Sequence, residues 1–176
     1  MQVRSRETFD IHERMLAAAA ATRRYIEVDG GRRVHLTEAG EGTPVLFLHG
    51  SSTSSLSLLP LLEHLDGVRA IVADRPGFGL SDPVRLERRR FRAAACEFVD
   101  EVLDALTLET AALAGNSMGG TWALWYALER PHRVRRLVLL GASPTLPGTR
   151  APTPMRAIAA PVIGDLLSRV KTSERM

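Results

Sequence analysis

The sequence predicts an α/β fold in which a mostly parallel sheet carries helices on both of its faces. From residue 44 onward, apolar runs of strand length alternate with segments of helical spacing. Turns rich in glycine follow the first three of these runs, and an Asp-Gly pair ahead of them indicates an antiparallel hairpin. With 176 residues, of which 45% are hydrophobic and 24% charged, the chain is long enough for one domain with a buried core.

The first elements are expected to be a helix and a hairpin. Residues from about 7 to 24 have amphipathic spacing with an alanine-rich face, so we expect a helical extension, residues 1–24, outside the core fold. The segments 25–28 and 33–37 alternate in polarity and are joined by Asp29-Gly30-Gly31. This pattern predicts an antiparallel pair at the start of the sheet.

Four parallel strands are predicted after the hairpin, because four short apolar runs are separated by helical segments. They lie at residues 44–48, 68–73, 110–114 and 135–141. We therefore expect residues 25–143 to form the N-terminal part of a core that stops after about six strands.

Two helices are predicted between these strands. Arg88-Arg89-Arg90 opens a segment in which apolar residues recur at helical spacing up to Leu106, and residues 122–128 form another apolar helical run. Prolines at 144, 147, 152 and 154 then mark a boundary. An apolar stripe between Met155 and Val170 predicts the start of a lid over residues 144–176.

The most informative segment is Gly115-Asn116-Ser117-Met118-Gly119, followed by Gly120, because it places a serine between a predicted strand and a predicted helix. On such a strained turn the hydroxyl projects above the sheet, and glycines two residues before and after it prevent collisions with neighbouring elements. The helix directs free N–H groups toward the serine, so Met118 offers a backbone donor to an oxyanion. Taken alone, the motif also fits a glycine-rich turn with an ordinary hydroxyl.

Two further loops each follow a predicted strand. The first is His49-Gly50 with the polar residues 51–55, and the second is the segment from Asp74 to Asp82 with the sequence DRPGFGLSD. Together with the serine motif, in this order, they make the chain resemble the α/β-hydrolase fold family from about Tyr25 to Ser143. A serine at the nucleophile position differs from the dehalogenase and epoxide-hydrolase branches, which place an aspartate there. The form Gly-Asn-Ser-Met-Gly-Gly is similar to that of meta-cleavage-product hydrolases and related esterases.

The resemblance implies roles for individual residues. Ser117 would be the catalytic nucleophile, and the His49-Gly50 turn would supply a second oxyanion donor, the N–H of Ser51 or Ser52, beside that of Met118. The loop from residue 74 to residue 82 would shape the site. The glycines of the elbow and turn, which support this geometry, are Gly50, Gly115, Gly119 and Gly120.

The expected proton relay is missing from the sequence. In the resembled family the acid and the histidine follow the serine along the chain, after later strands. Only His132 follows Ser117, and it precedes its strand, so we expect it at the opposite end of the sheet. His12, His35 and His64 are expected to be surface or packing residues. None of the aspartates at 66, 74, 82 and 165, nor Glu174, fits the position of the acid.

These expectations combine into two functional hypotheses. The first is a serine hydrolase that cleaves an ester or similar small-molecule carbonyl substrate through an acyl-enzyme, present as an N-terminal part without the acid and histidine of the triad. The second is a short, non-catalytic protein of the same fold that binds a partner. In either case the exposed sheet edge and the lid helix could support self-association.

Composition argues against several other classes. The net charge of +3 comes from dispersed arginines, which predicts no nucleic-acid partner. The single cysteine, Cys96, allows no disulfide and no metal spacing, and its apolar neighbours predict a buried thiol. No dinucleotide motif, P-loop or convincing signal or membrane segment is present, so we expect no metal, no cofactor, no membrane association and a cytoplasmic location.

Overall fold

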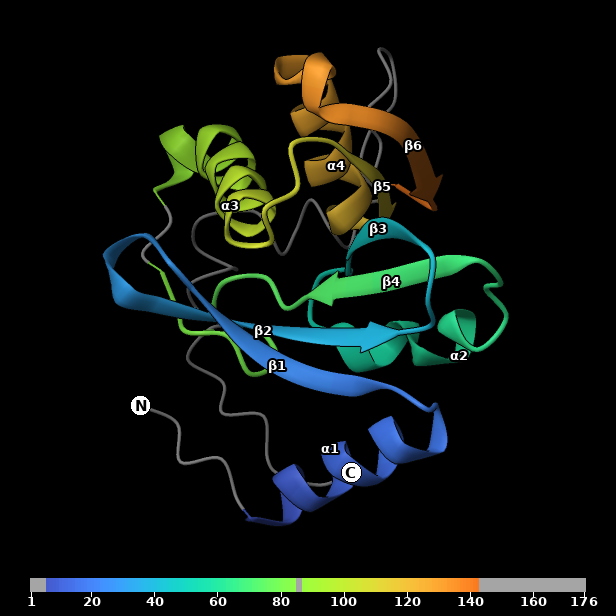
Figure 1. Ribbon diagram of the computed structural model, residues 1–176. Helices are drawn as coiled ribbons and strands as arrows, with labels where there is room; N and C mark the ends of the chain where they lie inside the picture. The colour runs from blue at the N-terminus through green and yellow to red at the C-terminus, as the bar shows by residue number, and fades with distance from the viewer. Residues whose placement is uncertain (1–5, 85–86, 143–176) are drawn as a thin grey trace. The chain divides into compact units, whose positions relative to one another are not determined.

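The computed structural model describes residues 6–84 and 87–142 and contains in them a six-stranded sheet with the order β1-β2-β4-β3-β5-β6 (Figure 1). The α/β fold class is therefore confirmed. The strands are β1 (Thr22–Val28), β2 (Arg32–Ala39), β3 (Thr43–Leu48), β4 (Val68–Ala73), β5 (Ala111–Asn116) and β6 (Val134–Leu140).

Strand pairing agrees with the predicted mixture of directions. β3 runs parallel to β4 and β5, and β5 runs parallel to β6, whereas β1 and β2 form the predicted antiparallel hairpin. The hairpin turns through Asp29–Gly31, where Gly30 and Gly31 have φ values of 75° and 71° that favour glycine. β2 also pairs antiparallel with β4, which no local pattern had indicated.

Helices cover both faces of this sheet. The α-helices are α1 (Arg6–Ala18), α2 (Leu59–Leu62), α3 (Phe91–Ala105) and α4 (Met118–Glu129), and the 3₁₀ segments besides the hairpin turn are η2 (Ser55–Leu58), η3 (Arg88–Arg90) and η4 (Pro131–Arg133). Figure 1 shows α3 and α4 on one face and α1 and α2 on the other. This is the layered arrangement expected for parallel strands that are buried on both sides.

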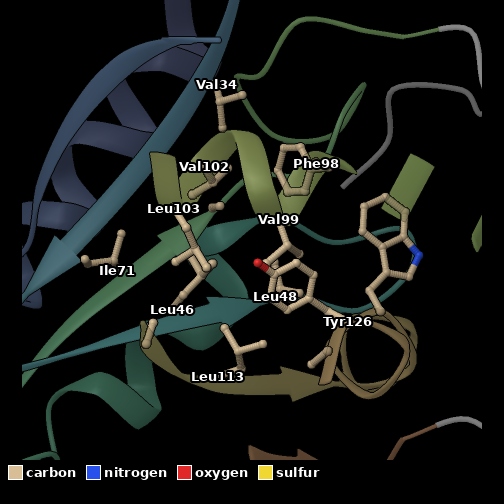
Figure 2. Packing of buried hydrophobic residues seen from close by; sticks show 14 of the residues in the cluster. Val34, Leu46, Leu48, Ile71, Phe98, Val99, Val102, Leu103, Leu113 and Tyr126 are labelled. Carbon is tan, nitrogen blue, oxygen red and sulfur yellow. The ribbon is translucent and has the colours of Figure 1, made fainter. Parts of the chain in front are cut away.

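Successive side chains along the strands point to opposite faces of the sheet and pack in two separate cores. In β3, Leu46 and Leu48 belong to the core under α3 and α4, whereas Phe47 belongs to the core under α1 and α2. Figure 2 shows side chains of β3 and β5, including Leu113, directed at those of α3 and at Tyr126 of α4. The sheet is thus anchored from both faces, and the carboxyl ends of its parallel strands are held in fixed positions.

The N-terminal helix ends earlier than predicted. It stops at Ala18, Ala20 has a left-handed φ of 47°, and β1 begins at Thr22. Arg23 and Arg24 are extended because they continue the pairing with β2. Leu16 is only 3% exposed and packs in the second core, so this helix contributes to the core in spite of its expected position outside it.

The helix predicted to start at Arg88-Arg89-Arg90 is α3. It begins at Phe91, directly after the arginine run, and buries Cys96 in the first core. Burial raises the pKa of this thiol to about 11, so it is protonated at neutral pH and inert, as the sequence predicted. The lid predicted over residues 144–176 lies outside the described residues.

Candidate active site

Ser117 lies at the junction between β5 and α4, at the carboxyl end of a central parallel strand. Its backbone has φ 52° and ψ −116°, a strained conformation for a residue with a side chain. The strain is held by hydrogen bonds on both sides, because Ser117 N–H donates to Leu140 O at 2.9 Å and Thr121 N–H donates to Ser117 O at 3.1 Å. The predicted elbow geometry is therefore present.

Three glycines allow the strand and the helix to approach each other. A Cβ on Gly115 would lie 2.5 Å from Gly119 O, and a Cβ on Gly120 would lie 2.8 Å from Gly115 O. A Cβ on Gly119 would lie 2.0 Å from Leu48 O of β3. Each of these neighbours is backbone, so no rotamer change could make room for a side chain.

The His49-Gly50 turn is brought against Ser117. A Cβ on Gly50 would lie 3.4 Å from Ser117 Cβ and 2.9 Å from Asn116 Oδ1. Asn116 is itself held by a 3.1 Å hydrogen bond from its Nδ2 to Leu140 O. Two loops that are 67 positions apart in sequence therefore meet at one point above the sheet, because β3 and β5 are neighbours.

The backbone donors predicted for an oxyanion site are free in this part of the chain. Within residues 6–84 and 87–142, the N–H groups of Ser51, Ser52 and Met118 have no hydrogen-bond acceptor. Ser51 and Ser52 are exposed, and Ser52 has a left-handed φ of 57°. Met118 occupies the first position of α4, where an N–H group has no acceptor within the helix.

His49 is fully buried and its two ring nitrogens are occupied. Nδ1 is 2.9 Å from Gly50 O, and Nε2 accepts a 2.9 Å hydrogen bond from the Arg75 N–H. The ring is therefore the neutral tautomer with its proton on Nδ1. Burial, and then the nearby charge of Arg75, lower the pKa of His49 to about 4, so its role here is to hold the turn.

Because His49 is buried in its neutral form, we expect the folded chain to lose stability at acidic pH. The pKa of His49 is about 4 in the folded chain, whereas the ordinary value is 6.5, so the unfolded chain binds more protons between these pH values. Stability should therefore fall as the pH drops from 6.5 to 4, by about 3 kcal/mol from this group. Urea unfolding measured at intervals from pH 7.5 to pH 4 would show a midpoint that decreases in that window.

His49→Gln provides the matched comparison for the pH experiment, because its side chain does not titrate. The variant should be less stable at pH 7.5 but should show a shallower pH dependence. A wild-type midpoint that stays constant between pH 7 and pH 4.5 would contradict the burial of a neutral imidazole.

Asp74 organises the loops around the site. Its carboxylate lies 2.9 Å from His35 Nδ1 and accepts N–H hydrogen bonds from Ser55 at 2.6 Å and Leu80 at 2.8 Å. Burial opposes its ionisation, but the hydrogen bonds, first that of His35, outweigh burial and hold the pKa of Asp74 below its usual value. Asp74 is thus a structural carboxylate that ties β2 to both loops.

Sequence reasoning gave no individual role to Arg75, which follows Asp74 at the end of β4. The side chain is buried, and its Nη2 donates a 2.7 Å hydrogen bond to Gly50 O. The guanidinium lies over the rings of Phe78, at 4.7 Å, and Trp122, at 5.0 Å. The sequence signal for Arg75 was its place in the charged pair Asp74-Arg75 directly after an apolar strand. Charged residues are seldom buried there without a specific contact.

The other histidines do not reach Ser117. His132 lies in η4, before β6, and the pairing of Ala111 with Val134 places it at the opposite end of the sheet from Ser117, about 20 Å away. His12 and His35 are buried with their rings in edge contact, and His64 is exposed. Their predicted status as surface or packing residues is confirmed.

The described ranges contain neither a cluster of metal-binding side chains nor a helix that could span a membrane. No group of three or more His, Cys, Asp or Glu side chains there has an arrangement suited to a metal ion. None of the helices in the same ranges combines the length and apolar character needed to cross a membrane.

Comparison with known proteins adds an independent line of evidence. A family model described as the alpha/beta hydrolase fold matches residues 43–160. A 2-hydroxy-6-oxo-6-phenylhexa-2,4-dienoate hydrolase of Comamonas testosteroni is 37% identical over 132 residues, which cover 71% of this chain and 45% of that protein. A 2-hydroxy-6-oxononadienedioate/2-hydroxy-6-oxononatrienedioate hydrolase of the same organism is 40% identical over 114 residues, which cover 62% and 40%.

A solved structure gives a consistent result. The carboxylesterase CesB of Bacillus subtilis superposes with a TM-score of 0.65 at 28% identity, over 74% of this chain and 47% of that protein. The chain spans about half the length of the curated relatives that it matches and of this esterase.

Proposed function

Because the chain belongs to the α/β-hydrolase fold family, we propose that it is a serine hydrolase that cleaves an ester or similar carbonyl substrate through an acyl-enzyme on Ser117. The observation that carries the proposal is the strained, positive φ of Ser117 at the end of β5, directly beside Gly50. A strained serine next to free backbone donors is the arrangement that acyl transfer requires.

The proposed reaction begins with attack of Ser117 Oγ on the carbonyl carbon of the substrate. The carbonyl oxygen becomes an oxyanion, which the N–H groups of Met118 and of Ser51 or Ser52 stabilise. Collapse of the tetrahedral intermediate expels the leaving group and leaves an ester between the substrate and Ser117. Attack of water on that ester by the same route releases the acid and regenerates the serine.

The proton of Ser117 must be taken up by a base, and the histidines of this chain do not provide one. His49 is neutral with its ring nitrogens occupied, and His132 lies at the other end of the sheet. We therefore propose that the acid and the histidine of the triad are not among these 176 residues. Without them, binding and the oxyanion donors still leave about 10³ to 10⁴-fold acceleration over water.

The proposed substrate class follows from the site and from the relatives. Relatives that are 37% and 40% identical are named as hydrolases of 2-hydroxy-6-oxo compounds, and the structural neighbour is named as a carboxylesterase. Both kinds of name place a carbonyl group in the substrate. We propose a small carbonyl substrate and no metal or organic cofactor, since a serine, backbone donors and a general base together carry out this reaction.

A non-catalytic binding protein of the same fold is the second candidate, and the edge of the sheet favours it. Among the described residues β6 pairs with β5 alone, and its Val138 and Leu139 are 48% and 40% exposed. An apolar edge strand of this kind tends to pair with another chain. Self-association through this edge is compatible with both candidates.

Covalent trapping distinguishes the two candidates. Incubation with excess p-nitrophenyl acetate should acetylate Ser117, and the adduct should be found in the peptide that contains it by mass spectrometry. Ser117→Ala should lose this labelling completely, because alanine has no hydroxyl to form the ester. The exposed Ser57 is the control, and Ser57→Ala should be labelled like the wild-type chain. Labelling that is spread over surface serines, with none at Ser117, would favour the binding protein.

A further inference from the structure

The carbonyl oxygen of Gly50 is held by an unusual number of donors. It is 2.9 Å from Nδ1 of His49, and it accepts hydrogen bonds from Thr53 Oγ1 at 3.0 Å and from Arg75 Nη2 at 2.7 Å. A carbonyl oxygen has two lone pairs, so three donors leave it little freedom to rotate. The charged donor makes the shortest of the three contacts, as charge-assisted hydrogen bonds do.

The direction of the Gly50 carbonyl determines the direction of the next N–H group. The Gly50 C=O and the Ser51 N–H belong to one peptide unit, which is planar and trans, so the two bonds point in opposite directions. Three donors on one side of this peptide therefore fix the Ser51 N–H on the other side. That N–H has no acceptor in the described ranges, and Gly50 lies against Ser117.

Arg75 is suited to this task because nothing acidic competes for it in the described part of the chain. It is 2% exposed, and within residues 6–84 and 87–142 its guanidinium donates a hydrogen bond only to Gly50 O, while its Nε has no partner there. The neighbouring carboxylate of Asp74 is already engaged by His35, Ser55 and Leu80. Burial lowers the pKa of Arg75 to about 10, so the side chain remains charged at neutral pH.

We propose that Arg75 is a positioning residue for the oxyanion site, in which its guanidinium holds and polarises the Gly50–Ser51 peptide so that the Ser51 N–H is aimed at the oxyanion formed on Ser117. This inference rests on the proposed function and sharpens it, because it selects Ser51 over Ser52 as the second donor. The backbone N–H of Arg75 supports the same peptide through His49 Nε2, so one residue steadies the turn at two points.

The proposal is tested with Arg75→Met and Arg75→Lys in the full chain. Methionine fills part of the space without a hydrogen bond, so the rate constant for acylation by p-nitrophenyl acetate should fall by about 10 to 10²-fold, below the 10² to 10³-fold loss of a deleted donor. KM should change by less than about twofold, because the ester binds before the oxyanion develops. Lysine restores a charged donor and should recover a part of the lost rate.

A spectroscopic measurement reads the peptide itself. In chain labelled with ¹⁵N-serine, the Ser51 amide should shift upfield in Arg75→Met relative to wild type, because a donor has been removed from the attached carbonyl. Arg133→Met is the matched control, since Arg133 also donates to a backbone carbonyl, that of Leu108, but at the other end of the sheet. It should leave the Ser51 signal and the acylation rate unchanged.

The outcomes separate the two hypotheses. If wild-type chain shows no acylation at Ser117, the proposed function fails, and the Ser51 signal still reports whether Arg75 holds the peptide. If Ser117 is acylated and Arg75→Met acylates within twofold of wild type, the positioning role is wrong. It is also overturned if Arg133→Met lowers the rate as much as Arg75→Met does, because the effect would then be one of general stability.

Discussion

Gly119→Ala is expected to prevent stable folding of the sheet. The new Cβ would lie 2.0 Å from Leu48 O and 2.6 Å from His49 O, so α4 would have to move away from β3. Overpacking in cores costs about 1 to 3 kcal/mol even where side chains can adjust, and here the obstacle is backbone. We expect a loss of about 3 kcal/mol or more in the free energy of unfolding, a large share of the stability of a typical domain. Urea unfolding followed by circular dichroism measures it.

Gly67→Ala is the control for this experiment. Gly67 has a φ of 67°, but a Cβ there would meet nothing within 4 Å, so the cost should be only the conformational one, about 1 kcal/mol. If Gly119→Ala were no less stable than Gly67→Ala, the close approach of α4 to β3 would be incorrect. The elbow geometry would then lose its main steric support.

Local sequence patterns predicted most of the fold because its strands are short apolar runs with clear punctuation. The strand predicted at 68–73 is β4, and that predicted at 44–48 differs from β3 by one residue. A strand buried on both faces is apolar along its whole length, so it can be recognised without knowing which strands are its neighbours. The insertion of β4 between β2 and β3 could not be predicted, because strand order depends on contacts between distant segments.

In the candidate site, too, contiguous features were predictable from the sequence and contacts between distant segments were not. The positive φ of Ser117 followed from the glycine spacing, since strand, serine and helix are contiguous. The contact of Arg75 with Gly50 did not, because it joins the ends of β4 and β3 across 25 positions. His35 likewise becomes a buried partner of Asp74 only when β2 pairs with β4. The strained backbone of Ser117 could therefore be predicted from the sequence. The hydrogen bonds that hold the site could not, because they form only once the order of the strands brings distant segments together.

On the proposed function, adding an acid and a histidine after later strands is expected to produce the largest gain in activity. The described chain presents Ser117 with free donors but no base, and its relatives are about twice as long. The change is a fusion to the C-terminal segment of the 37% identical Comamonas testosteroni hydrolase, the part that lies beyond the match. On the proposed function, that segment carries the acid and the histidine after later strands. A positioned general base contributes about 10² to 10⁴-fold, so hydrolysis of p-nitrophenyl acetate should rise by that factor.

This gain should depend on Ser117 and not on His132. Ser117→Ala should remove it entirely, because the new base acts only on that hydroxyl. His132→Ala should leave it largely intact, since the pairing of Ala111 with Val134 places His132 at the far end of the sheet. An equal loss from the two substitutions would refute this placement of the histidines. Full activity of the chain without the fusion would show that a base already lies within these 176 residues.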